Sequence, residues 1–164
     1  MNFISKILAP TDCSEASIEA LNYSIKIAKA HRAELMVLHV VSHLENTASY
    51  SFSDKSVSSF KDDFLWAKNQ LEKFWEAIGG NEIETDLELG FGDPFTEIMR
   101  YAKSKKNDVI VMGTHGRIGL KHFLMGSVAE KVVRYSPIPV VTVKHKSYEF
   151  FPKPGYEYDL NKRY

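Results

Sequence analysis

The 164 residues of this chain, 44% of them hydrophobic, are enough to fill one core, and we therefore expect a single globular domain. The 21 basic and 21 acidic residues cancel, so no overall field attracts the protein to nucleic acid or to an anionic membrane. No stretch has the pattern of a membrane span or a signal peptide, and the single cysteine, Cys13, excludes an internal disulfide and a cysteine-rich zinc site. These features predict a cytoplasmic protein that binds neither nucleic acid nor membrane.

The first part of the chain predicts a strand, a helix and a second strand. Residues 3–9 have the composition of a buried strand, and residues 10–14 break it with turn and helix-capping side chains. Small and apolar residues then recur at helical spacing from Glu15 to about Arg32. Residues 34–41 form an almost continuous apolar run, as expected of a strand that is buried on both faces of a parallel sheet.

A polar, serine-rich stretch and a long amphipathic helix are predicted next. Residues 42–59 show no sustained periodicity, which is typical of a mobile surface loop. The helix that follows ends at Gly79–Gly80, and its apolar face consists of Phe60, Phe64, Ala67, Leu71, Phe74, Trp75 and Ile78. Residues 83–89 alternate as a half-buried strand, and Asp93–Pro94 then opens another helix, which ends near residues 105–107.

The remaining pattern completes the alternation of strands and helices. Residues 109–112 predict a short buried strand, residues 113–125 a glycine-bearing loop, residues 127–135 a helix and residues 137–143 a last strand. The inward-facing residues of this helix are expected to be Val128, Val132 and Val133. Because parallel crossovers are nearly always right-handed, this order predicts an α/β domain with a single doubly wound five-stranded parallel sheet and helices on both faces.

The domain is expected to span residues 1–146, with residues 147–164 as an aromatic C-terminal extension. In this extension aromatic side chains alternate with prolines and charges, which excludes a regular helix throughout. Two interpretations stay open. The extension either packs on the domain's own surface, which we favour, or reaches a partner subunit, since aromatic residues are common in cores and at interfaces.

Two predicted loops converge at the carboxyl edge of the sheet, where open parallel sheets bind their ligands. The first is Pro10-Thr11-Asp12-Cys13-Ser14, and the second runs from Gly113 through His115 and Arg117 to Gly126–Ser127. Glycines let the backbone approach a ligand closely, and main-chain N–H groups at a helix N-terminus form a concave site for phosphate oxygens. Ser127 adds a hydroxyl donor, and His115 or Arg117 would place positive charge beside the anion. The second loop therefore suits a polyphosphate.

Other features carry weaker signals. Asp12 alone is as consistent with a helix cap as with a ligand contact, and His39, inside an apolar strand, is interpreted as a satisfied core histidine. Cys13 is more consistent with a small buried residue than with a redox site. The other histidines lack metal-ligand spacing, so no metal site built by the protein is predicted. The pair Gly90-x-Gly92 lacks the third glycine of a dinucleotide fingerprint, and no P-loop motif is present.

The spacing Gly113-x2-Gly116-x9-Gly126-Ser127, on a predicted strand, loop and helix, resembles the ATP-binding signature of the universal stress protein family. Residues 7–12, 90–94 and 137–143 are similar to the first strand and turn, the third turn and the last strand of that family. The resemblance implies an adenine-nucleotide α-hydrolase-like sheet with strand order 3-2-1-4-5. It also implies a homodimer through the exposed edge of the last strand, formed by Val140, Val141, Thr142 and Val143.

The resemblance also implies roles within the site. Asp12 would accept hydrogen bonds from ribose hydroxyls, the backbone of Val40 would meet the adenine edge, and the glycine-bearing loop would hold the phosphates. The implied ligand is ATP, or ADP or AMP, accompanied by Mg²⁺ or Mn²⁺. The nucleotide-binding residues that it implies are Pro10, Thr11, Asp12, Val40, Met112, Gly113, His115, Gly116, Arg117, Gly126, Ser127 and Val128.

Three functional hypotheses remain. The first is a dimeric, ATP-binding regulatory module of the stress response with at most slow hydrolysis, in which no catalytic residue is assigned because none is visibly placed to activate water. The second is an enzyme such as a nucleotidyl transferase, in which His115 or Arg117 would stabilise the reacting phosphate. The third is an interaction module that dimerises and recruits a partner without nucleotide.

Overall fold

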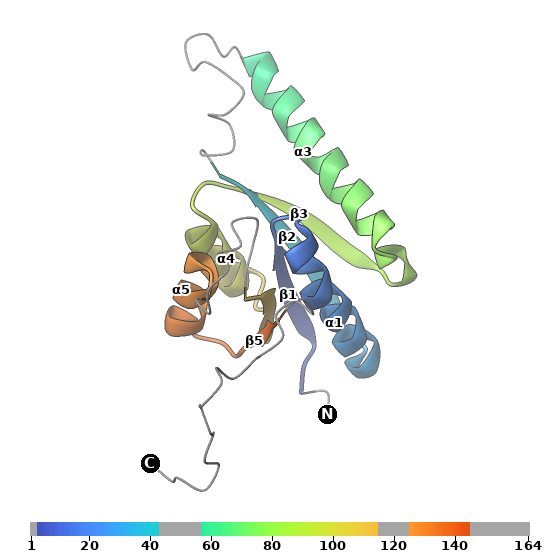
Figure 1. Cartoon of the computed structure of the whole chain (residues 1–164), viewed down its shortest axis with the longest axis vertical. Coiled ribbons are helices and arrows are strands. Elements are labelled where there is room, and N and C mark those ends of the chain that lie inside the picture. Colours follow the sequence, from blue (N-terminus) through green and yellow to red (C-terminus); the bar gives the residue numbers. More distant parts are fainter. Residues whose placement is uncertain (1–2, 43–56, 115–124, 145–164) are drawn as a thin grey trace, which may run out of the picture.

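The computed structural model describes residues 3–42, 57–114 and 125–144, and of residues 57–63 it describes the backbone alone. Five parallel strands form one sheet in the order β3-β2-β1-β4-β5. Figure 1 shows α1 and α3 on one side of this sheet and α4 and α5 on the other. The predicted doubly wound sheet with strand order 3-2-1-4-5 is confirmed.

The elements follow one another as the periodicity predicts. The strands are β1 (Lys6–Thr11), β2 (Glu34–Val41), β3 (Thr85–Phe91), β4 (Val109–Gly113) and β5 (Val140–Val143). The helices are α1 (Glu15–His31), α3 (Val57–Ala77), α4 (Pro94–Ser104) and α5 (Ser127–Tyr135), with a short 3₁₀ helix, η1 (Gly80–Glu82), before β3. Arg32 after α1 and Gly79 after α3 adopt left-handed φ angles of 53° and 78°, which end these helices.

The sheet has a separate hydrophobic core on each face. Neighbouring residues of a strand point to opposite faces, so Ile7 of β1 packs with α1 and α3 while Leu8 packs with α4 and α5. On the first face, Leu71 and Trp75 of α3 join the core. Because β1, β2 and β4 contribute buried residues to both cores, they need apolar side chains at nearly every position, which explains the continuous apolar runs in the sequence.

Three strands extend further toward their carboxyl ends than the sequence pattern predicts, among them β3, which ends at Phe91 rather than at residue 89. β1 continues through Pro10 and Thr11, which pair with β2. A proline is tolerated here because the ladder between β1 and β4 ends at Leu8, so no backbone donor is needed on that side. Gly113, predicted to open the loop, is the last residue of β4 and pairs with Val143.

The long helix α3 also differs from its prediction. It begins at Val57, inside the stretch predicted as a loop, and residues 43–56 lie outside the described residues. The side chain of Phe64 is 42% exposed, and its ring stacks on that of Phe91 with 6.0 Å between the ring centroids. Figure 1 shows the first part of α3 projecting beyond the sheet, which leaves less of it to pack on the core. The predicted apolar face is buried at Ala67, Leu71 and Trp75.

The inner face of α5 is only partly as predicted, because Val133 is 48% exposed whereas Val132 is 0% exposed. The sheet is met by Val132 and Ala129, which lie one turn apart on the helix. We expect Val132→Ala to lower the free energy of unfolding by about 2 kcal/mol, because it removes two buried carbon atoms and leaves a cavity. Val133→Ala is the matched control and is expected to cost less than about 0.5 kcal/mol in urea unfolding. If the two variants lost the same free energy of unfolding, this packing of α5 would be contradicted.

The start of α4 gives a pH-dependent prediction. Asp93 is the N-cap, and its carboxylate accepts hydrogen bonds from the Thr96 N–H (2.9 Å) and the Thr96 hydroxyl (2.8 Å). These hydrogen bonds, first that of the N–H, lower the pKa of Asp93. A lowered pKa stabilises the fold at neutral pH, and this stabilisation is lost as the pH falls through the folded-state pKa.

We therefore expect Asp93→Ala to lower the free energy of unfolding by about 1 kcal/mol at pH 7. When urea unfolding is measured against pH, the variant and the unmodified protein should differ less in their free energy of unfolding below about pH 3.9, the ordinary pKa of aspartate. Asp86→Ala, which removes an exposed carboxylate within β3 and not at a helix start, is the control for the loss of an aspartate side chain. A constant difference across the whole pH range would show that the carboxylate charge is not what stabilises α4.

Candidate functional site

The turn from β1 into α1 is fixed by its own side chains. The Asp12 carboxylate accepts hydrogen bonds from the Ser14 N–H (3.1 Å) and the Ser14 hydroxyl (2.6 Å). Cys13 adopts a left-handed φ of 58°, and its N–H donates to the Thr11 hydroxyl oxygen at 3.0 Å. The N-cap of α1 is Ser14 and not Asp12, so the helix-cap alternative for Asp12 is wrong. This local network holds the Asp12 carboxylate at the end of β1.

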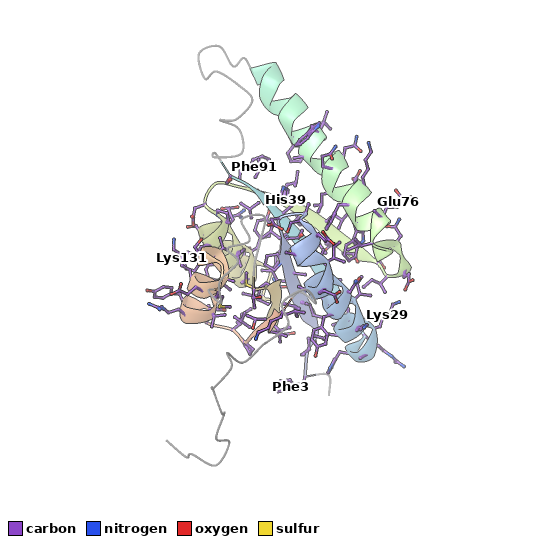
Figure 2. The ribbon with its side chains drawn as sticks, viewed as in Figure 1. Phe3, Lys29, His39, Glu76, Phe91 and Lys131 are labelled. Atoms are coloured by element: carbon purple, nitrogen blue, oxygen red, sulfur yellow. The ribbon has the colours of Figure 1, made fainter. Side chains whose placement is uncertain are left out.

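A buried polar cluster lies beneath this turn. Thr11, Ser17 and His39 are 7%, 4% and 7% exposed. The Thr11 and Ser17 hydroxyl oxygens are 2.9 Å apart, and Nδ1 of His39 is 3.0 Å from the Thr11 carbonyl oxygen. Figure 2 shows His39 on the strand beside the first turn of α1. The interpretation of His39 as a satisfied core histidine is confirmed, and its partner is the main chain next to Asp12.

The second predicted loop starts and ends at one place. The Thr114 N–H donates to the Val143 carbonyl at 3.1 Å, and the Gly126 N–H donates to the Thr114 carbonyl at 2.8 Å. Gly126 is the N-cap of α5 and contributes no capping side chain, so the first N–H groups of α5, from Ser127 on, have no partner within the helix. His115, Gly116 and Arg117 lie outside the described residues.

The turn after β3 borders the same edge of the sheet. Gly90 is buried, and a Cβ atom there would lie 3.0 Å from Oε2 of Glu97 and 3.2 Å from Cγ2 of Val40, which accounts for a glycine at this close contact. The Nε and Nη2 groups of Arg100 donate hydrogen bonds to the two carboxylate oxygens of Glu97, at 3.0 and 2.6 Å. These hydrogen bonds lower the pKa of the Glu97 carboxyl. Sequence reasoning missed Glu97, although a Glu and an Arg three residues apart in a predicted helix are a recognisable pair.

The fold brings the described members of the predicted site to one edge of the sheet. Thr11 and Asp12 lie at the carboxyl end of β1, Val40 one residue before the end of β2, and Met112 and Gly113 at the end of β4. Pro10 precedes Thr11 within β1, and Gly126, Ser127 and Val128 form the start of α5. Because all five strands are parallel, these ends share one edge.

The topology makes the junction of β1 and β4 a switch point. The helix after β1, α1, packs on one face of the sheet, whereas the helix after β4, α5, packs on the other. The ladder between the two strands consists of Ile7–Val109 and Leu8–Ile110 and does not reach their carboxyl ends. Ligands of open α/β sheets bind in the crevice at such a point. The described residues therefore form a doubly wound α/β domain with a candidate ligand site between the Asp12 turn and the start of α5.

A match to a known protein family extends over most of this chain. The model described as the universal stress protein family matches residues 4–144. The universal stress protein MJ0531 of Methanocaldococcus jannaschii is 36% identical over 145 residues, which cover 87% of this chain and 84% of the relative. The chain belongs to the universal stress protein family.

Solved structures show the same fold. Protein MJ0577 of M. jannaschii, solved as a test case of structural genomics, aligns with a TM-score of 0.66 and 32% identity, covering 88% of this chain and 98% of that chain. A universal stress protein in complex with cAMP aligns with a TM-score of 0.62 and 20% identity, covering 86% of this chain and 97% of that chain. At the lower identity the likeness establishes the fold alone.

Neither a membrane-spanning helix nor a cluster of metal ligands is found in the part of the chain that the structure describes. None of the helices in ranges 3–42, 57–114 and 125–144 is both long and apolar enough to cross a membrane. Those ranges also hold no group of three or more His, Cys, Asp or Glu side chains arranged to bind a metal ion.

Proposed function

We propose that this protein binds an adenine nucleotide, ATP in the first place, at the carboxyl edge of its sheet. The observation that carries the proposal is that two chemically complementary elements share the carboxyl edge of the sheet beside the switch point between β1 and β4. One is the oriented carboxylate of Asp12, and the other is the N-terminus of α5 after Gly126. A carboxylate accepts hydrogen bonds from sugar hydroxyls, and a helix N-terminus attracts phosphate.

The nucleotide would lie across these elements in a defined order. Asp12 would bind the ribose, the main chain of Val40 would meet the adenine edge, and the N–H groups at Ser127 and Val128 would bind phosphate oxygens. Met112 and Gly113 would line the site from β4. The universal stress protein solved with cAMP supports an adenine ligand, because it is an instance of this fold holding one. His115, Gly116 and Arg117 are proposed to complete the phosphate site.

We further propose a regulatory role in the stress response with slow hydrolysis at most. His39 is only 7% exposed and lies beneath the Asp12 turn, so its burial separates the ring from a water molecule at the nucleotide phosphates. Mg²⁺ or Mn²⁺ accompanying ATP would be coordinated by its phosphate oxygens. Nucleotide binding would then change the populations of two conformational states of the protein and would not serve mainly to supply a substrate for a reaction.

Isothermal titration calorimetry with ATP, ADP, AMP and GTP tests nucleotide binding. Gly126→Val places a side chain at the start of α5, and because Gly126 has φ −57° and ψ 145°, the backbone conformation tolerates valine. We expect this variant to bind ATP at least about tenfold more weakly. Gly113→Val is expected to act in the same direction.

Gly79→Ala, at the opposite end of the domain before η1, is the control and should keep the affinity of the unmodified protein. If the unmodified protein binds none of the adenine nucleotides at millimolar concentration, the nucleotide proposal fails and the interaction-module hypothesis takes its place. Equal weakening by Gly79→Ala would show that the loss reports general destabilisation.

We also propose that two copies pair through β5. Among the described residues, no strand covers the outer side of β5. The carbonyls of Pro139 and Val143 accept hydrogen bonds from Ile110 and Thr114, so these alternate residues bond toward β4. Alternate residues of a strand form their backbone hydrogen bonds on opposite sides. Because Val143 bonds toward β4, the N–H of the preceding residue, Thr142, points to the outer edge, where a second copy could accept its hydrogen bond.

Native mass spectrometry with an edge variant tests the dimer. Thr142→Pro removes the outward N–H and leaves the ladder to β4 intact, because proline is tolerated at the open edge of a sheet. We expect the dimer to dissociate at concentrations at least about tenfold higher than for the unmodified protein. Thr142→Val keeps the N–H and should keep the dimer. A monomeric unmodified protein, or a dimer that Thr142→Pro does not weaken, would rule out pairing through β5.

A further inference from the structure

The hydrogen bond of His39 defines the tautomer of a buried ring. His39 lies opposite Thr11 in the β1–β2 register and is 7% exposed. Its Nδ1 is 3.0 Å from the Thr11 carbonyl oxygen. A carbonyl oxygen accepts hydrogen bonds and never donates them, so Nδ1 carries the hydrogen and donates it to Thr11.

The acceptor belongs to the peptide group that leads into the candidate site. The Thr11 carbonyl is part of the peptide plane that also contains the N and Cα atoms of Asp12. The ladder between β1 and β4 has already ended at Leu8, so β4 does not hold the main chain of β1 at this point. The ladder to β2 does, since Thr11 pairs with His39 in it, and local hydrogen bonds add to this ladder: the His39 ring donates to the Thr11 carbonyl, and the Thr11 hydroxyl bonds the Ser17 hydroxyl and accepts from the Cys13 N–H.

We propose that His39 is a positioning residue of the nucleotide site. By holding the Thr11–Asp12 peptide plane, it fixes the direction from which the Asp12 side chain leaves the backbone, and so places the carboxylate for the ribose hydroxyls. His39 itself does not touch the nucleotide. This inference rests on the proposed nucleotide binding and deepens it, because it assigns ribose recognition to a buried residue of the neighbouring strand.

The experiment compares two ligands that differ only at the ribose. The affinities for ATP and for 2′,3′-dideoxy-ATP are measured by calorimetry well below the unfolding temperature of each variant. His39→Leu removes the donor and keeps most of the volume. His39→Asn keeps a donor, because the amide nitrogen of asparagine occupies the place of Nδ1, whereas His39→Gln moves the donor to the place of Nε2. His31→Leu changes a histidine at the far end of α1 and serves as the control.

We expect the unmodified protein to bind ATP more tightly than the dideoxy analogue. His39→Leu should weaken ATP binding about tenfold and change binding of the analogue less than about twofold, because only the ribose contact is lost. His39→Gln should resemble His39→Leu, while His39→Asn and His31→Leu should keep the preference for ATP. Asp12→Ala should abolish the preference, and His39→Leu in that background should add no further loss, since both act on one contact.

Two results overturn the inference in distinguishable ways. If the unmodified protein binds ATP but His39→Leu or His39→Gln keeps its preference over the analogue, His39 is structural only and nucleotide binding stands. If the unmodified protein binds neither ligand, the proposed function fails and the role of His39 fails with it. Should His39→Leu not fold, the comparison of His39→Asn with His39→Gln decides between the two roles on its own.

Discussion

Gly80→Ala is expected to destabilise the protein by about 3 kcal/mol, a large loss for a single methyl group. Gly80 is the first residue of η1 and is buried. A Cβ atom there would overlap the indole ring of Trp75 at Cε2, Cδ2 and Nε1. Trp75 is 2% exposed and belongs to the core under α1 and α3, so it has little room to move away.

Equilibrium unfolding in urea measures this loss, and the neighbouring glycine provides the control. Gly79 has a φ of +78° with nothing within 4 Å of a Cβ atom, so Gly79→Ala carries only backbone strain, about 1 kcal/mol. Adding Trp75→Leu to Gly80→Ala should cost less than the sum of the two single changes, because the smaller side chain relieves the overlap. A loss for Gly80→Ala no greater than for Gly79→Ala would contradict the close contact with the indole.

Leu71→Ala is expected to have a comparable effect through the opposite mechanism, the opening of a cavity. Leu71 is 1% exposed and lies in the middle of the core between α3 and the sheet. Its truncation should cost about 3 kcal/mol, within the range observed for buried leucines. The loss should appear as a lower urea midpoint with an unchanged slope.

The same helix supplies a matched leucine for comparison. Leu65 is 62% exposed, and Leu65→Ala should change the free energy of unfolding by less than about 0.5 kcal/mol. Both substitutions have the same helix propensity difference, so the contrast isolates burial. Similar losses at the two positions would mean that α3 packs through a different face.

The Gly80→Ala variant also tests where the proposed site lies. The chain between η1 and β3 lies at the amino ends of the strands, opposite the edge that carries Asp12 and Gly126. Gly80→Ala should therefore lower stability without lowering ATP affinity in the folded protein. A parallel loss of affinity would mean that the site depends on the whole domain rather than on its carboxyl edge.

Local pattern determined most of the fold. The apolar runs of β2 and β4, the helical face through Ala67, Leu71 and Trp75, and the Asp93–Pro94 start of α4 lie where periodicity and capping chemistry predict. These signals are local, because each depends on residues close together in the chain. The strand order needed more, and it came from the resemblance in the glycine spacing.

The position of the candidate site was predictable to the same extent. Two loops after β1 and β4 converge in a parallel sheet of this order, so the spacing, together with the resemblance, predicts that Asp12, Gly113 and Gly126 lie at one edge, as they do. What the sequence could not show is how the first loop is held. Ser14 occupies the N-cap position of α1, but its hydroxyl donates to the Asp12 carboxylate instead of capping the helix, an arrangement that depends on the backbone angles around Cys13.

Contacts between residues distant in sequence were decided only by the tertiary structure. Periodicity places both Val132 and Val133 near the inner face of α5, and only the rotation of the helix about its own axis against the sheet buries the first and exposes the second. Likewise, an apolar strand shows that His39 is buried but not which carbonyl it bonds, because its partner Thr11 lies 28 positions earlier. The sequence alone determines the helices and strands and their order along the chain, since those depend on neighbouring residues. Packing in three dimensions determines which side chains meet.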